Sequence, residues 1–101
     1  MPAELPAGWR LRIEDEVAST SDLLIACAQA GEPEGLAILA RTQTAGRGRD
    51  GRTWQSPRGN LYLSLLLRPD VPAREAPRWA LIAAVALAEA LEPYAPDVRL
   101  K

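Results

Sequence analysis

Apolar and polar positions follow different patterns along the chain, and each pattern predicts an element. Residues 9–17 alternate apolar and polar side chains with a period of two, which predicts a half-buried strand. Hydroxyl residues and an aspartate at 19–22 then suit a helix cap, and Gly31 ends the apolar segment that follows. The predicted elements in order are strand 9–17, helix 21–30, strand 36–42, strand 60–67, helix 73–91 and the beginning of a strand at 98–101.

This order of elements predicts an α+β fold, a mixed sheet with helices packed on it. The helix at 73–91 is nearly all apolar from Trp79 onward, so we expect it to be central. Since the chain ends on what resembles the start of a strand, we also expect it to be part of a larger domain.

Residues 43–59 follow neither pattern. The segment has four glycines, one proline and four arginines, and Trp54 is its only large apolar residue. Such a segment cannot build a core, so the sequence predicts a long loop. Long loops inside small domains are usually functional or disordered.

Charge is concentrated in the same region, although the net charge of the 101 residues is only −1. Positions 41–58 hold five arginines and one acid, a local balance of +4. A basic segment on an otherwise acidic chain favours a local anion site over a broad nucleic-acid surface. Between Gly46 and Arg52, glycines alternate with arginines, which predicts backbone amides and guanidinium forks around a phosphate or carboxylate. The spacing matches neither a P-loop nor, in its strand-to-helix context, a dinucleotide fingerprint.

Composition excludes several kinds of chemistry. The chain has no His and a single Cys, Cys27, so it cannot form an intramolecular disulfide, a His/Cys zinc site or a His-based triad. We predict no metal-binding residues. The first residues lack the pattern of a signal peptide, and the longest apolar run, 79–88, is half the length of a membrane span of ~20 residues. We therefore expect a cytoplasmic protein that contacts no membrane.

The segment from Gln43 to Ser64 resembles the signature of the biotin protein ligases, Q-x-x-G-R-G-R-x-G-R-x-W-x-S-P-x-G-N-L-Y-x-S, at every fixed position. Ser19-Thr20 is similar to that family's Ser-Thr-Asn/Ser element, and the end at Lys101 is similar to the start of its Lys-Trp-Pro-Asn-Asp motif. The resemblance implies a biotin/lipoate ligase catalytic domain, related in fold to class II aminoacyl-tRNA synthetases. Residues 1–101 would be its N-terminal part, truncated after Lys101, with no helix-turn-helix domain and no C-terminal domain.

The activity that the resemblance implies is a two-step ligation. Biotin and ATP, with Mg²⁺, would give biotinyl-5′-AMP and pyrophosphate, and a lysine of a biotin carboxyl carrier protein would then take the biotinyl group. Both nucleophiles belong to substrates, which agrees with a protein that only positions anions and neutralises charge. We expect this 101-residue chain alone to be weakly active or inactive. Because the strand pattern begins by Trp9, we expect no N-terminal helix-turn-helix and no DNA partner, and a homodimer stays open.

The resemblance also assigns site residues. The biotin-binding residues would be Ser19, Thr20, Gln43, Gly46, Arg47, Gly48 and Arg49. The ATP-binding residues would be Arg47, Arg49, Arg52, Trp54 and Lys101. Arg49, which would retain the intermediate, and Lys101, at the carboxylate–phosphate junction, would be the catalytic pair.

Other interpretations of the same residues stay open at this point. Ser19 and Thr20 also suit a plain helix cap, and Trp54 an ordinary packing residue. A lipoate or octanoate ligase is the nearest alternative enzyme. An Arg/Gly loop with Trp54 stacking on a base would instead describe a single-stranded nucleic-acid-binding module.

Overall fold

A computed structural model describes residues 5–97, with the exception of the Arg49 side chain. The predicted strand at 98–101, and Lys101 with it, lies outside the described residues. The chain divides between Arg68 and Pro69 into two compact units, each of which is described by itself.

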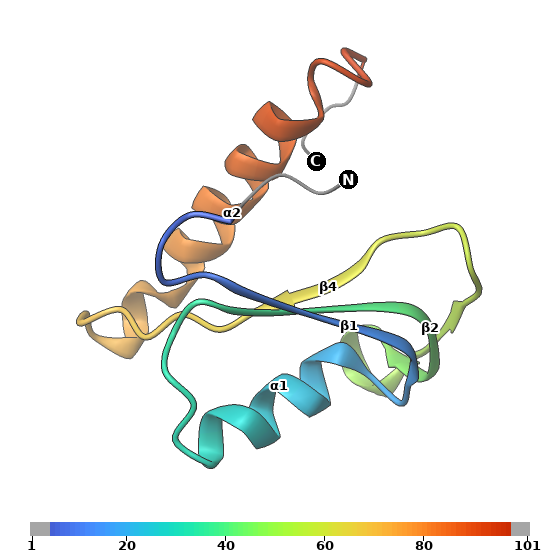
Figure 1. Ribbon diagram of the computed structural model, residues 1–101, viewed down its shortest axis with the longest axis horizontal. Coiled ribbons are helices and arrows are strands. Elements are labelled where there is room, and N and C mark those ends of the chain that lie inside the picture. The colour runs from blue at the N-terminus through green and yellow to red at the C-terminus, as the bar shows by residue number, and fades with distance from the viewer. Residues whose placement is uncertain (1–4, 98–101) are drawn as a thin grey trace. The chain divides into compact units, whose positions relative to one another are not determined.

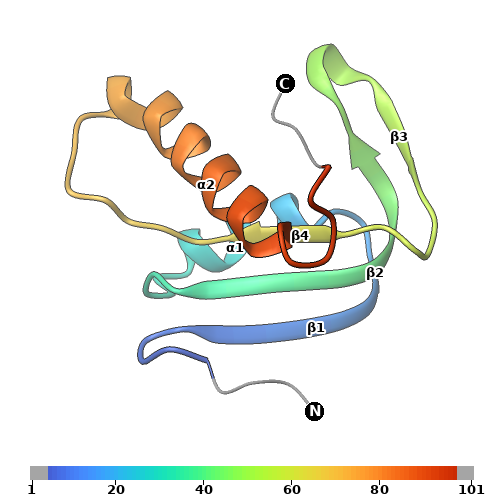
Figure 2. The same ribbon diagram turned by 90° about the horizontal axis from the view of Figure 1, so that it is seen from above.

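The first unit is a four-stranded mixed sheet with one helix on its face (Figure 1). The parallel strands β1 and β2 are joined through α1, and β4 and β3 pair antiparallel with the beginning and the end of β2, respectively (Figure 2). The bounds of the elements are β1 Arg10–Val17, α1 Thr20–Gln29, β2 Leu36–Arg47, β3 Thr53–Ser56 and β4 Tyr62–Leu65. The predictions for β1, α1, the beginning of β2, and β4 are thereby confirmed, as is the α+β class.

The core of this unit lies between α1 and the sheet. Ile38, near the beginning of β2, is fully buried, and Leu36 and Leu66 complete the buried cluster. Residues two apart on a strand share a face, so Leu36 and Ile38 both meet the helix. The helix packs Leu23, Leu24, Cys27 and Ala28 against them. Cys27 is thus a partly buried packing residue.

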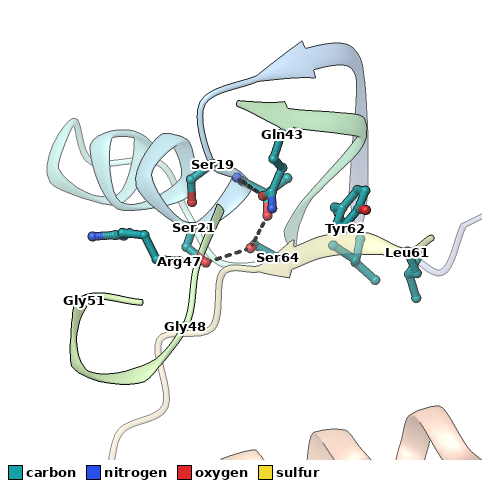
Figure 3. Close-up of a pocket in the computed structure, with 11 residues that line it drawn as sticks. Ser19, Ser21, Gln43, Arg47, Gly48, Gly51, Leu61, Tyr62 and Ser64 are labelled. Atoms are coloured by element: carbon teal, nitrogen blue, oxygen red, sulfur yellow. Dashed lines mark hydrogen bonds between the residues drawn. The ribbon is translucent and has the colours of Figure 1, made fainter. Parts of the chain in front are cut away.

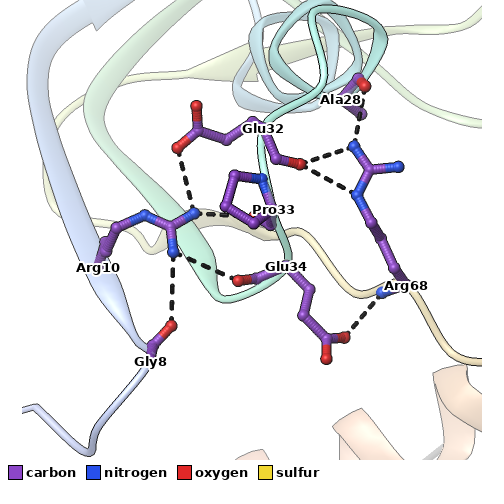
Figure 4. Close-up of polar contacts among 7 residues, drawn as sticks. All are labelled: Gly8, Arg10, Ala28, Glu32, Pro33, Glu34 and Arg68. Carbon is purple, nitrogen blue, oxygen red and sulfur yellow. Dashed lines mark hydrogen bonds and ion pairs between the residues drawn. The ribbon is translucent and has the colours of Figure 1, made fainter.

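Two arginines fasten the end of the sheet where β2 begins (Figure 4). Arg10 of β1 donates to the Pro33 carbonyl at 2.8 Å and pairs with the Glu32 carboxylate at 3.1 Å. Arg68, just beyond β4, donates to the carbonyls of Ala28 and Glu32 at 2.9 and 2.6 Å, so it satisfies acceptors at the end of α1. The turn between α1 and β2 is therefore held from both flanking strands.

The second unit contains the predicted helix at 73–91. A single 3₁₀ turn, Ala73–Glu75, leads into α2, Ala76–Leu91, with Pro77 in its first turn. The structure describes none of the α2 residues as buried, so the expectation of a central helix is not confirmed. No helix among the described residues is long and apolar enough to cross a membrane.

The prediction of a loop over residues 43–59 is partly wrong. The strand β2 continues to Arg47, and β3 pairs with it in a hairpin that bends out of the sheet (Figure 2). Gly46 lies opposite Trp54 and Arg47 opposite Thr53, with a register shift between Gln43 and Gly46. Glycine and arginine carry little strand preference, so local composition concealed a hairpin that the backbone pairing forms.

Candidate functional site

A hollow of about 460 Å³ opens where β2 and β4 meet the first turn of α1 (Figure 3). We call it the first hollow. One wall consists of hydroxyl and amide side chains, Ser19, Thr20, Ser21, Gln43 and Ser64. The remaining walls come from Arg47, Gly48, Gly51, Leu61, Tyr62 and Leu63.

The start of α1 positions the hydroxyl wall. Ser19 has an extended backbone, with φ −159°, and its Oγ accepts from the backbone N–H of Asp22 at 3.3 Å. This is the helix cap that the sequence predicted. Thr20 is 4% exposed, and its Oγ1 lies 2.8 Å from the Oγ of Ser64 on β4. Ser19 therefore both caps α1 and lines the first hollow, whereas Thr20 lines the hollow without capping the helix.

Gln43 connects the helix to the hairpin. Its Oε1 accepts from the Thr20 backbone N–H at 2.8 Å, and its Nε2 donates to the Ser56 Oγ at 3.3 Å. These two bonds fix the orientation of the amide and leave its second N–H for a ligand. No buried side-chain nitrogen or oxygen in the described part of the chain lacks a partner. The polar wall is thus pre-organised.

The two glycines that precede the hairpin turn are required by close packing. A Cβ on Gly46 would lie 2.5 Å from the Ser56 Oγ, and one on Gly48 would overlap the indole nitrogen of Trp54. The Gly48 N–H donates to the Arg52 carbonyl at 2.7 Å. The predicted nest of backbone amides facing an anion is therefore wrong at Gly48, because the hairpin uses that donor.

A second hollow of about 430 Å³ adjoins the first. It shares Gln43, Arg47, Leu61 and Tyr62 with the first hollow and adds Trp54, Gln55, Ser56 and Asn60. The Tyr62 hydroxyl donates to the Pro57 carbonyl at 2.7 Å and fixes the turn before β4. Trp54 is 63% exposed, so much of its side chain remains available for a planar ligand.

The structure brings most of the predicted site residues together. Ser19, Thr20, Gln43, Arg47 and Gly48 line the first hollow, and Trp54 lines the second. Gly46 lies in the strand behind the wall, and Arg52 lines neither hollow. The Arg49 side chain and Lys101 lie outside the described residues.

Charge in the two hollows comes from one side chain. Arg47 is the charged residue among the described residues that line them. Its guanidinium donates to the Asp22 carboxylate, in the first turn of α1. We expected several arginines around one anion; among the described side chains, Arg47 is the one arginine that lines the two hollows.

Sequence reasoning missed the roles of Ser64, Ser56, Ser21 and Tyr62. Ser64 is the hub of the hydroxyl wall, since its Oγ also lies 3.3 Å from the Ser21 Oγ. Three of the four occupy fixed positions of the signature, which was the available signal.

Residues suited to holding a metal do not gather in this structure. Among residues 5–97, no three His, Cys, Asp or Glu side chains are grouped as metal ligands. Mg²⁺ in nucleotide sites is held by one or two carboxylates together with substrate phosphates, so a cluster of three protein ligands is not required for it.

Comparison with known proteins identifies the family. The sequence model of the biotin/lipoate A/B protein ligase family matches residues 16–100. The chain belongs to this family. Among curated relatives, the bifunctional ligase/repressor BirA of Bacillus spizizenii is 42% identical over 89 residues, 87% of this chain and 27% of the relative. The biotin--[acetyl-CoA-carboxylase] ligase of Paracoccus denitrificans is 50% identical over 54 residues, 54% of this chain and 22% of the relative.

Solved structures agree in fold. Biotin protein ligase from Leishmania major in complex with biotinyl-5-AMP matches with a TM-score of 0.68 and 35% identity, over 88% of this chain and 36% of that chain. Biotin protein ligase from Aquifex aeolicus in complex with biotin and ATP matches with a TM-score of 0.68 and 36% identity, over 82% and 34%. This chain thus spans about a quarter to a third of the proteins that it matches.

Proposed function

We propose that this chain provides the acid- and nucleotide-binding part of an ATP-dependent biotin–protein ligase. The observation that carries the proposal is the pair of adjoining hollows that share Gln43 and Arg47. Two substrates that must react with each other need neighbouring sites with a common cationic boundary.

The first hollow suits the ring of biotin. A ureido group presents two N–H donors and one carbonyl acceptor, and hydroxyl side chains both donate and accept. Thr20, Ser21 and Ser64 place three hydroxyls on one wall, and Gln43 adds an N–H donor. The apolar side chains of Leu61 and Tyr62 offer a surface for the aliphatic part of the ligand.

The second hollow suits the nucleotide. The Trp54 indole is exposed enough to stack on a base, and Arg47, at the boundary of the hollows, would meet the α-phosphate and the acid. A carboxylate oxygen of biotin attacks the α-phosphorus and the bond to the bridging oxygen breaks, which releases pyrophosphate. The lysine amine of the acceptor then attacks the acyl carbon, AMP leaves, and the amine loses a proton.

The other roles that the resemblance implies complete the proposal. Arg49 would retain the acyl-adenylate, Lys101 would reach the carboxylate–phosphate junction, and Arg52 would contact phosphates from outside the hollows. The acceptor would be a biotin carboxyl carrier protein, the nucleotide would bring its own Mg²⁺, and a homodimer and a cytoplasmic location belong to the same proposal. The absence of a DNA partner stays a prediction, since several relatives are named bifunctional ligase/repressor.

The test is acid-dependent ATP–pyrophosphate exchange with biotin, lipoate and octanoate in parallel, supplemented by equilibrium binding of biotin to the chain. We expect biotin, and neither of the other two acids, to bind to the chain. Exchange should be weak or absent, because the chain spans about a third of the ligases that it matches, and Ser64→Ala should weaken biotin more than ATP. Exchange with lipoate but not biotin would reassign the substrate within the family. Salt-dependent binding of single-stranded RNA that biotin and ATP leave unchanged, with no exchange, would replace the proposal with the nucleic-acid alternative.

A further inference from the structure

Arg47 is held by an acidic partner before any ligand arrives. It is the last residue of β2, and its guanidinium donates to the carboxylate of Asp22 in the first turn of α1. Figure 3 shows its side chain extended away from Gln43 and Ser64. The cation that both hollows share therefore already has a counter-ion.

The position of Asp22 is fixed by the helix. Its backbone N–H donates to the Ser19 Oγ at 3.3 Å, which places Asp22 in the first turn of α1, directly after Ser21 of the hydroxyl wall. An acidic side chain at this place also interacts favourably with the helix dipole. Asp22 consequently keeps a stabilising environment when Arg47 leaves it, which lowers the cost of exchange.

The ion pair is open to water. The side chains of Arg47 and Asp22 are 56% and 48% exposed, respectively. Pairs with this exposure are weak, so an incoming phosphate can displace the carboxylate. An anionic ligand and Asp22 nevertheless compete for one guanidinium.

We propose that Asp22 is a resident counter-ion that competes with the anionic ligand for Arg47 and lowers the affinity of the site for that ligand. The inference rests on the proposed function, because it takes the ligand at Arg47 to carry a phosphate. Its consequence is selectivity by charge: a strongly anionic phosphate displaces Asp22 more readily than a weakly charged acid.

The experiment is a calorimetric titration of the chain with inorganic pyrophosphate. Asp22→Asn removes the competing charge and keeps the shape, so we expect it to bind pyrophosphate about 1.4- to 5-fold more tightly, the range that an exposed ion pair allows. The matched control is Asp15→Asn, which removes one charge and one aspartate–arginine pair, to Arg58 at 2.6 Å, outside both hollows. It corrects for the change in net charge.

A second comparison separates competition from a merely structural role. In an Arg47→Ala background we expect Asp22→Asn to leave pyrophosphate affinity unchanged, because the cation for which it competes is gone. Equal affinities of Asp22→Asn and Asp15→Asn would overturn the inference. So would weaker binding by Asp22→Asn, which would mean that Asp22 orients Arg47, or the absence of pyrophosphate binding by the chain and its variants.

Pyrophosphate affinity, the quantity measured here, tests the counter-ion separately from the proposed function. Pyrophosphate binding needs neither biotin nor catalysis, so tighter binding by Asp22→Asn in a chain that binds no biotin would support the counter-ion and count against the proposed biotin site. Biotin binding together with no effect of Asp22→Asn on pyrophosphate affinity would support the proposed biotin site and overturn the counter-ion.

Discussion

Substitution of Gly46 by alanine tests the packing behind the hydroxyl wall. The new Cβ would lie 2.5 Å from the Ser56 Oγ, 0.9 Å less than the 3.4 Å at which ordinary contact begins, and 3.2 Å from the Trp54 carbonyl oxygen. The carbonyl belongs to β3, and it cannot move without disturbing the pairing of β3 with β2. Ser56 must therefore turn away, and its hydrogen bond from Gln43 is lost.

The expected magnitudes follow from these contacts. Overpacking of this kind costs about 1–3 kcal/mol of stability. The lost hydrogen bond releases the Gln43 amide from its fixed orientation, which at about 1 kcal/mol corresponds to a roughly fivefold loss of biotin affinity. The measurements are urea denaturation of the chain and equilibrium binding of biotin.

The double variant Gly46→Ala/Ser56→Ala provides the matched control. Removal of the Ser56 hydroxyl makes room for the new methyl group, so the double variant should be more stable than the two single effects together predict. It should still bind biotin weakly, because Gln43 remains without its partner. Unchanged stability of Gly46→Ala, or no recovery in the double variant, would refute the close packing.

Three further changes separate stability from binding. Ile38→Ala, at a fully buried position, should destabilise the chain by about 2–5 kcal/mol in urea denaturation, and a loss under 1 kcal/mol would contradict the assigned core. Arg68→Ala should cost on the order of 1.5 kcal/mol in the same assay while biotin affinity stays constant, since its partners lie at the far end of β2; a change in affinity would contradict that separation. Trp54→Ala should weaken ATP more than biotin in direct titrations, and equal losses would assign the indole to support of Gly48 instead.

The sequence predicted those elements whose polar and apolar side chains follow a regular local pattern. The period of two in β1 and the capped helix α1 are legible in sequence, because each depends on residues a few positions apart. The hairpin from β2 to β3 was missed for the opposite reason. Its stability depends on backbone pairing and on the absence of a side chain at Gly46, and neither gives an apolar pattern.

The same distinction applies to the site. The signature indicated which residues belong together and assigned Gly46 and Gly48 to ligand contact. The structure adds a second reason for both glycines, the close approach to Ser56 and Trp54, and Gly48 also lines the first hollow. Ser64 escaped notice because its partner Thr20 is 44 residues away. Only the pairing of β4 with β2 brings the two hydroxyls together.

The strand β2 connects the hydrophobic core to the candidate site. Its first half carries Ile38 into the core, and its second half carries Gln43 and Arg47 to the two hollows. The Ala45 N–H donates to the Ala18 carbonyl at 2.8 Å, so the outer half is also fastened to the start of α1. A ligand that binds the hydroxyl wall therefore contacts elements whose relative position is already set by the core. The cost of ordering the site is met largely during folding, and the freedom that remains lies at Arg47, whose partner is exposed to water and exchangeable.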